Sequence, residues 1–97
     1  METTIHWQQE NKGEIRLLAE GQQIGKMDIS RNNTHVTVYH TEVDPQYEGQ
    51  GLAKKLLAQL VAFARENGLK IKPLCPYVHL QFKRHAEDYA DVWEKNL

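Results

Sequence analysis

Cysteine, net charge and long apolar runs are all scarce in this chain. Its 97 residues include a single cysteine, Cys75, and carry a formal net charge of −1. One cysteine forms no disulfide within the chain and cannot by itself build a zinc site. Of the five histidines, only His35 and His40 are close in sequence, and their odd spacing puts them on opposite faces of a predicted strand, so the sequence predicts no bound metal.

The balanced charge and the short apolar runs exclude two kinds of partner. A net charge of −1 offers no basic surface for a nucleic acid backbone. No apolar run approaches the about 20 residues that a membrane helix requires, and the first residues lack the basic and apolar regions of a signal peptide. We therefore expect a cytoplasmic protein that binds neither nucleic acid nor membrane.

Repeats, linkers and low-complexity tracts are missing as well. The hydrophobic fraction of 40% and the charged fraction of 26% are ordinary for a globular domain. A chain of this length has room for one core, so we predict one domain over residues 1–97.

The first half of the chain has the pattern of strands joined by short turns. Apolar and polar residues alternate, a period typical of strands with one buried face. The predicted strands cover 4–10, 15–19, 25–29 and 36–43, with turn clusters at 11–13, 20–22 and 31–33. In the last strand, this alternation places Val36 and Val38 on one face with His40 and Glu42. The four segments predict an antiparallel meander.

The second half changes to a helical period. Apolar residues recur about one turn apart over 51–66, which predicts a helix with one buried face. Asn67-Gly68 is a favourable helix end, and a short apolar strand over 69–74 follows. Pro76 suits the first position of a second helix. A short terminal helix is predicted from Tyr89, Val92 and Trp93.

The segment between the two halves has the composition of a phosphate-binding turn. It reads Gln46-Tyr47-Glu48-Gly49-Gln50-Gly51-Leu52-Ala53. Its two glycines let the backbone approach a ligand closely, and the amides at the start of the following helix lack intrahelical partners. Because the helix dipole also favours negative charge there, the turn suits a pyrophosphate.

Two common nucleotide-binding motifs do not fit this turn. Lys54 stands where a dinucleotide-binding fingerprint has its third glycine, and the chain contains no Gly-Lys-Ser or Gly-Lys-Thr of a Walker loop. The antiparallel meander before the turn also differs from the βαβ unit of a dinucleotide fold.

The turn instead resembles the acyl-coenzyme A turn of the Gcn5-related N-acetyltransferases (the GNAT superfamily). That turn has Gln or Arg, two residues, Gly, one residue, then Gly or Ala, and Gln46, Gly49 and Gly51 occupy every fixed position. With the context at 42–53 and at 74–78, the chain resembles the small single-domain branch of the superfamily over nearly its whole length. The resemblance implies an α/β (α+β) fold: a mixed, mostly antiparallel sheet with a meander of four strands, a central helix after the fourth strand, a fifth strand and short C-terminal helices.

The resemblance also implies acetyl-coenzyme A (acetyl-CoA) as the co-substrate. Its pantetheine arm would lie between the fourth and fifth strands and pair with backbone groups of Thr41, Glu42 and Val43. Its pyrophosphate would meet the turn, where the candidate contacts are Gln46, Gly49, Gln50, Gly51, Leu52 and Ala53. Lys54 and Lys55 lie in the first helical turn, where cations oppose the helix dipole unless an anion is nearby. The alternative is that both lysines are simply solvated.

Cys75 is a candidate nucleophile. As the cap of a helix that begins at Pro76, it lies where the dipole stabilises a thiolate, and the resemblance places it beside the acyl end of the cofactor. His79, one helical turn further on, is then a candidate base. The alternative reading of Cys75 is a small buried residue without chemistry.

Direct transfer to the amine needs fewer groups. Glu42 or His40 would take a proton from the amine, a backbone amide would hold the oxyanion, and Tyr77 or Cys75 would protonate the departing thiolate. The alternative is that Glu42, His40 and His79 are solvated or satisfied polar residues, and that Tyr77 is a core aromatic with a wet hydroxyl.

The predicted function is therefore an acetyl-CoA-dependent N-acetyltransferase that acts on an amine. The short turn at 11–13 leaves no room for the helices that wall the acceptor site in larger members of the superfamily. We therefore expect an open site that accepts a peptide, a protein or a polyamine, on a monomer or weak homodimer. The alternatives are a non-catalytic acyl-CoA-binding domain and a protein-interaction module with a degenerate GNAT fold.

Overall fold

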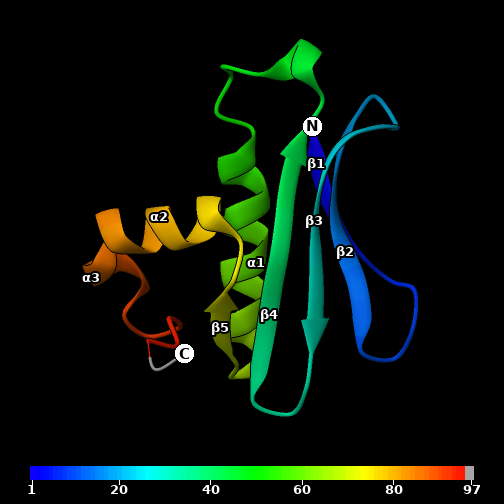
Figure 1. The fold of residues 1–97 in the computed structure, drawn as a ribbon. Coiled ribbons are helices and arrows are strands. Elements are labelled where there is room, and N and C mark those ends of the chain that lie inside the picture. The colour runs from blue at the N-terminus through cyan, green and yellow to red at the C-terminus, as the bar shows by residue number, and fades with distance from the viewer. Residues whose placement is uncertain (96–97) are drawn as a thin grey trace.

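The computed structural model describes residues 1–95 and is built around one five-stranded sheet (Figure 1). The elements in order are β1 (Glu2–Trp7), β2 (Lys12–Ala19), β3 (Gln22–Arg31), β4 (His35–Val43), η1 (Pro45–Tyr47), α1 (Ala53–Asn67), β5 (Lys70–Pro73), α2 (Pro76–Arg84) and α3 (Ala86–Tyr89). The strand order is β1-β2-β3-β4-β5, with β5 parallel to β4 and all other pairs antiparallel. This arrangement confirms the predicted mixed sheet with its meander, central helix and fifth strand.

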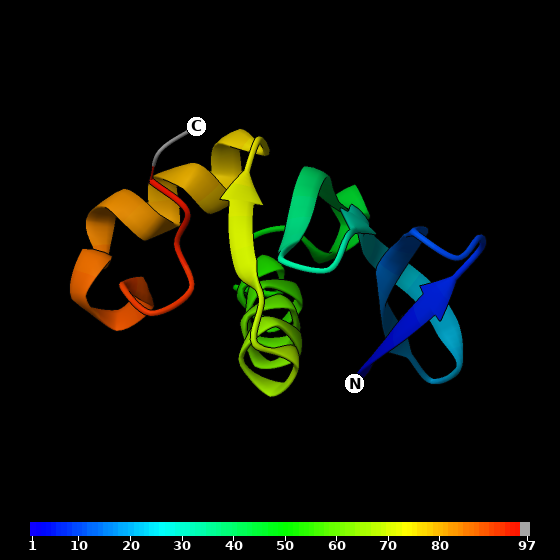
Figure 2. The ribbon, with the colours of Figure 1, turned by 90° about the horizontal axis from the view of Figure 1, so that it is seen from below.

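One face of the sheet packs against α1, and the opposite face has no helix over it among residues 1–95 (Figure 2). The helix contributes Leu56, Leu57, Leu60, Val61, Phe63 and Ala64 to the core. Alternate residues of β2, β3 and β4 meet this stripe, as the period of two predicts. Each fully buried aliphatic side chain stabilises the fold by about 1.5–3 kcal/mol, so this interface carries most of the stability.

The first hairpin differs from its predicted bounds. β1 ends at Trp7, and the chain turns through residues 8–11, where the amides of Gln8 and Gln9 donate to the carbonyl of Lys12. Gly13 lies inside β2. A Cβ at this position would stand 2.5 Å from the carbonyl oxygen of His6, so the strand requires a glycine here. The glycine at 13 therefore marks a close approach of two strands, whereas the sequence alone suggested a turn.

The predicted face of His40 and Glu42 is wrong, because β4 contains a β-bulge. Asp28 pairs with His40 and Ile29 pairs with Val38, so Tyr39 is an extra residue on β4. One inserted residue reverses the alternation beyond it. His40 and Glu42 therefore lie on the open face, opposite to buried Val38.

The C-terminal residues correct a second prediction. Val92 and Trp93 follow α3 and belong to no helix; Trp93 instead forms a parallel bridge with Ile71 of β5. The Ile71 amide donates to the Val92 carbonyl at 2.6 Å, and the Glu94 amide donates to the Ile71 carbonyl at 2.9 Å. This short segment forms hydrogen bonds with the outer edge of β5. The sequence pattern did not predict this pairing.

Ion pairs cross the open face of the sheet around Glu14, which is only 7% exposed. Its carboxylate accepts a hydrogen bond from Arg16 Nε at 2.6 Å and lies 3.8 Å from Lys26 Nζ. Burial alone raises the pKa of Glu14, but the hydrogen bond and charge of Arg16, together with the charge of Lys26, outweigh it. They hold the pKa below its ordinary value of 4.5.

We predict that Glu14→Gln lowers the free energy of unfolding by about 1 kcal/mol near neutral pH, because the hydrogen bond to Arg16, whose side chain is 31% exposed, loses its charged acceptor. A carboxyl whose pKa falls on folding stabilises the native state above its unfolded-state pKa, and this contribution disappears as the pH drops through the folded-state pKa. Urea unfolding between about pH 7 and about pH 3 should therefore show the two proteins converging in stability at acid pH. Glu10→Gln, in the exposed loop, is the control, and a difference that stays constant with pH would contradict the assignment.

Candidate functional site

β4 and β5 separate immediately after Val38 and Pro73, which are their last paired residues. The Cys75 amide donates to the Val38 carbonyl at 2.9 Å, and this bond is the final backbone link between the two strands. Beyond it, β4 continues to Val43, whereas the segment after β5 turns into α2. The result is a gap that has the free edge of β4 on one side and the start of α2 on the other.

The backbone groups of Thr41 and Val43 face this gap. The Asp44 amide donates to the Ile24 carbonyl at 2.7 Å, so residue 44 directs its peptide groups toward β3. Peptide groups alternate in direction along a strand, so residues 43 and 41 direct theirs to the opposite edge. That edge has lost its partner strand, which leaves hydrogen-bonding groups available to a ligand.

The glycine turn presents a row of unpaired amides. Gly49 and Gly51 have φ angles of 82° and 71°, a region that other residues rarely adopt, and no atom lies within 4 Å of a Cβ built on either one. Of the hydrogen bonds formed within residues 1–95, none is donated by the amides of Gly49 to Ala53. Leu52 precedes α1 without a side-chain cap, so the helix N-terminus is also open.

The Asp44 side chain fixes the approach to the turn. Its carboxylate caps η1 by accepting a hydrogen bond from the Gln46 amide at 3.0 Å. This bond uses the Gln46 amide within the protein, so Gln46 supports the turn while the amides further on stay available.

A cleft of about 270 Å³ lies between the glycine turn, the end of β4 and the first turns of α2. It is lined by Val43, Tyr47, Glu48, Gly49, Gly51, Leu52, Ala53, Lys54, Tyr77 and Gln81. The structure thus brings together six of the predicted cofactor-binding residues, whereas Thr41, Glu42, Gln46, Gln50 and Lys55 do not line the cleft. Tyr47, Glu48 and Gln81 were not predicted. Gln81 follows Tyr77 by four residues, a helical spacing that places both on one face and could have identified it.

The two lysines of the turn have different surroundings. Lys54 lines the cleft. Lys55 lines a separate hollow between α1 and the N-terminal residues, together with Thr3 and Gln59. Only Lys54 is therefore positioned beside the unpaired amides.

Cys75 caps α2 at the point where the strands separate. Its side chain is 2% exposed, and its Sγ lies 3.3 Å from Thr41 Oγ1. The predicted partner His79 lies elsewhere: its exposed ring contacts Trp93, with 6.2 Å between centroids. Among residues 1–95 no base lies within hydrogen-bonding distance of the thiol, whose hydrogen-bond partner is the Thr41 hydroxyl.

Tyr77 lines the cleft from the first turn of α2 and is half-buried. Burial raises the pKa of its phenol above the ordinary value of 10.0, and the charges of Tyr89 and Cys75 act in the same direction. The hydroxyl therefore remains protonated at neutral pH and can donate a proton or a hydrogen bond into the cleft.

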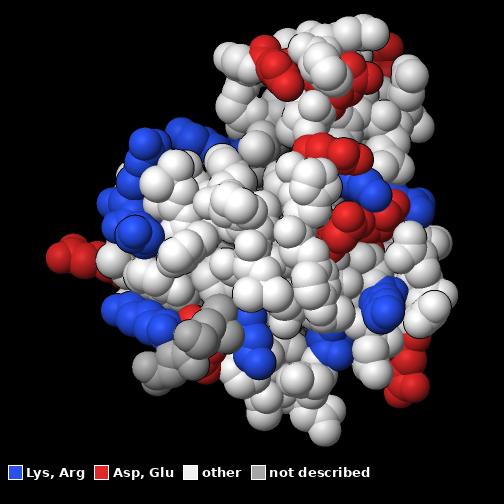
Figure 3. Space-filling model, in the orientation of Figure 1, with Lys and Arg blue, Asp and Glu red and all other residues white. Residues whose placement is uncertain are grey.

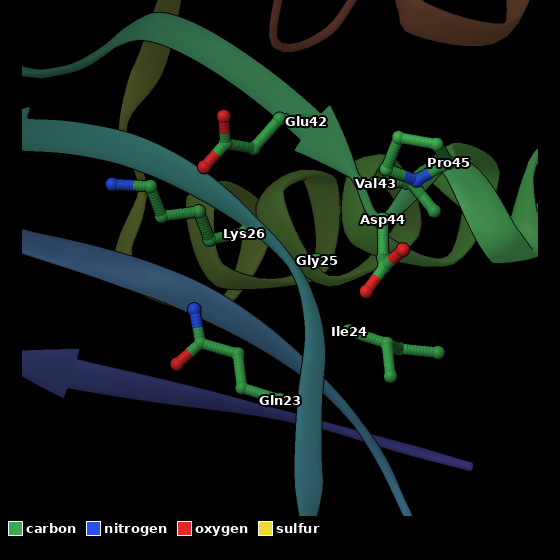
Figure 4. A pocket seen from close by; sticks show the side chains of 8 residues that line it. All are labelled: Gln23, Ile24, Gly25, Lys26, Glu42, Val43, Asp44 and Pro45. Carbon is green, nitrogen blue, oxygen red and sulfur yellow. The ribbon is translucent and has the colours of Figure 1, made fainter.

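His40 and Glu42 face the open side of the sheet, with 3.3 Å between His40 Nε2 and Glu42 Oε2. A second hollow of about 390 Å³ lies beside Glu42, between the end of β4 and the start of β3 (Figure 4). Glu42 and Lys26 line it from paired positions, and Asp44 lies at its far end. Val43 lines both this hollow and the cleft, so β4 separates the two spaces.

Two further features bear on partners. No three or more His, Cys, Asp or Glu side chains of residues 1–95 are grouped to hold a metal ion. Nor does any helix in that part of the chain have the length and apolar character to cross a membrane.

Comparisons with known proteins agree with this geometry. Residues 12–92 match the model of the family described as GCN5-related N-acetyl-transferase. A GCN5-like protein from Staphylococcus aureus, solved by NMR, is 31% identical, with a TM-score of 0.67 over 94% of this chain and 87% of that chain. A protein from Bacillus anthracis described as a streptothricin acetyltransferase, solved with acetyl coenzyme A, is 23% identical, with a TM-score of 0.61 over 79% of this chain and 47% of that chain. Human N-acetyltransferase 8B is 26% identical over 70% of this chain. The matched region covers 34% of that protein's length.

The matched region holds every element from β2 to α3 and so includes the whole cleft. The family is one of acetyltransferase enzymes, and the Staphylococcus protein shows its fold in a chain of similar size. Because the family model covers most of the sequence, this protein belongs to the GCN5-related N-acetyltransferase family.

Proposed function

We propose that this protein transfers an acetyl group from acetyl-CoA to an amine. The observation that carries the proposal is that Val43, at the end of the free edge of β4, and the glycine turn with its unpaired amides line one cleft. An extended arm with amide groups suits the first, and a pyrophosphate suits the second. The Bacillus relative, solved with acetyl coenzyme A, shares this fold.

In this proposal the pantetheine arm pairs with the backbone of Thr41 and Val43, as an added strand would. Tyr77 and Gln81 form the opposite wall of the cleft. The pyrophosphate accepts hydrogen bonds from the amides between Gly49 and Ala53, and Lys54 neutralises part of its charge. The thioester then lies where the strands separate, near Cys75.

The chemical step is direct transfer. The amine, arriving from the open face, gives up a proton, and its nitrogen attacks the thioester carbon to form a tetrahedral oxyanion. The C–S bond then breaks, the acetyl group stays on nitrogen, and the thiolate of coenzyme A takes a proton. Glu42, with His40 beside it, is our candidate for the base, acting directly or through water. Tyr77 is our candidate for the acid.

Cys75 has a supporting part in this scheme. A thiol that hydrogen-bonds a hydroxyl, with no base at hand, is poorly activated as a nucleophile. We propose that Cys75 and Thr41, which contact each other where the strands separate, lie beside the acetyl group just beyond the lining of the cleft. The covalent route, in which the acetyl group passes through Cys75, is the alternative that experiment must separate.

We predict that acetyl-CoA binds and stabilises the fold. A ligand at a hundred times its dissociation constant adds about 2.7 kcal/mol to the free energy of unfolding, which a thermal melt detects readily. Lys54→Ala should weaken binding several-fold through loss of one phosphate contact, whereas Lys55→Ala should bind almost normally because Lys55 lines a different hollow. Titration calorimetry on both variants measures the difference.

The two lysine variants control for each other, since both remove a cation from the first turn of α1. Equal losses would mean that general charge near the helix N-terminus, and not position in the cleft, governs affinity. An unchanged melting temperature with acetyl-CoA would instead favour a protein-interaction module. Binding without acetylation of any amine would favour a non-catalytic acyl-CoA-binding domain.

We predict different effects for two residues at the thioester end. Tyr77→Phe should lower kcat by roughly ten- to a hundred-fold, because the proton donor for the thiolate is lost while the ring is kept. Cys75→Ser should retain most of the activity, and intact-mass sampling within a single turnover should find no acetyl adduct on the native protein. An adduct that disappears in Cys75→Ser, together with loss of turnover, would establish the covalent route in place of direct transfer.

A further inference from the structure

We propose that the acceptor is a primary amine at the end of an aliphatic chain, and that Tyr39 and Leu74 form the subsite that binds this chain. The inference rests on the proposed acetyl transfer and names the class of acceptor. It places the subsite on the open face of the sheet, outside the cleft assigned to acetyl-CoA.

Tyr39 and Leu74 lie at the mouth of the gap between the strands. They directly follow Val38 and Pro73, the last paired residues of β4 and β5. Tyr39 is 49% exposed and Leu74 is 56% exposed, although both stand next to buried residues. Since Pro73 and Cys75 are buried on the α1 side, Leu74 points to the open face.

The β-bulge places Tyr39 on the same face as Leu74. Tyr39 is the extra residue of β4, and its hydroxyl lies 2.7 Å from Ser30 Oγ. This hydrogen bond holds the phenol against the sheet and leaves half of the side chain exposed as an apolar surface. An exposed aromatic ring with a fixed position is a favourable contact for a flexible alkyl chain, because little of its own freedom is lost on binding.

The Glu42 carboxylate, which pairs across the strands with Lys26, is an anionic group beside this surface that favours an amine. His40 and Glu42 follow Tyr39 on the same face, and the Glu42 carboxylate can attract an ammonium group before the proton is removed. Residues other than Lys, Arg, Asp and Glu cover most of the middle of the molecule in this orientation, between basic side chains near α2 and α3 and a mixed acidic and basic group on the other side (Figure 3). An occupant with a cationic head and an apolar stem matches this arrangement.

A lysine side chain or an alkyl polyamine needs only apolar contact for its methylene groups. The subsite therefore favours acceptors whose methylene groups separate the amine from the rest of the molecule.

The test is a series of straight-chain amines from n-propylamine to n-hexylamine with saturating acetyl-CoA. These amines have nearly equal basicity, so chain length is the variable. The native protein should show kcat/KM rising by about two- to four-fold for each added methylene that enters the subsite. Leu74→Ser and Tyr39→Ser should flatten this dependence and leave the affinity for acetyl-CoA unchanged.

Leu80→Ser is the matched control, because Leu80 is a comparably exposed leucine, 44% exposed, on α2. It should keep the full chain-length dependence. Transfer to amines with no dependence on chain length would overturn this inference and leave the proposed function standing. The same flattening in Leu80→Ser would also overturn it, since any exposed leucine would then serve.

A second measurement separates this inference from turnover. In the complex with coenzyme A, n-hexylamine should shift the methyl NMR signals of Leu74 and leave those of Leu80 in place. Absence of any shift at Leu74 would overturn the subsite. Binding of acetyl-CoA without transfer to any amine would instead overturn the proposed function, and the acceptor class with it.

Discussion

The loss of pairing between β4 and β5 after Val38 and Pro73 is the constraint on which the rest of the site depends. A parallel pair that continued to Val43 would satisfy its own backbone groups and leave nothing for a ligand. Pro73 helps to end the pairing, because proline has no amide hydrogen to donate. The chain then turns into α2 with Cys75 as its cap, and the turn holds the two strands apart. The protein thus keeps a stretch of β4 edge unpaired, with Tyr39 and Leu74 exposed where the pairing ends.

Most of the architecture could be predicted from the sequence because it rests on patterns with a fixed period. The alternation in β2 and β3 and the one-turn spacing in α1 each describe a single buried face, and both faces are buried as expected. The glycine turn was predictable for another reason: Gly49 and Gly51 require positive φ angles that few other residues tolerate. Local chemistry of this kind leaves a direct mark on the sequence.

What could not be predicted depends on contacts between distant residues. The bulge at Tyr39 has no strong local signal, yet one inserted residue moved His40 and Glu42 to the other face. The difference between Lys54 and Lys55 follows from which hollow each side chain enters, a tertiary property. Val92 and Trp93 have helical spacing but pair with β5, because an unsatisfied strand edge offers more hydrogen bonds than one further helical turn.

The bulge also connects the two halves of the proposed reaction. Without the extra residue, His40 and Glu42 would point toward the α1 side with Val38, and the open face would lack an acidic group near the gap. With it, the Thr41 side chain lies against Cys75 and Val43 lines the cleft, while Tyr39, His40 and Glu42 lie on the open face, where the proposed acceptor arrives. A single strand can then bind coenzyme A with its backbone edge and approach an amine with its side chains. In the proposed reaction, this division on β4 brings both substrates to one point.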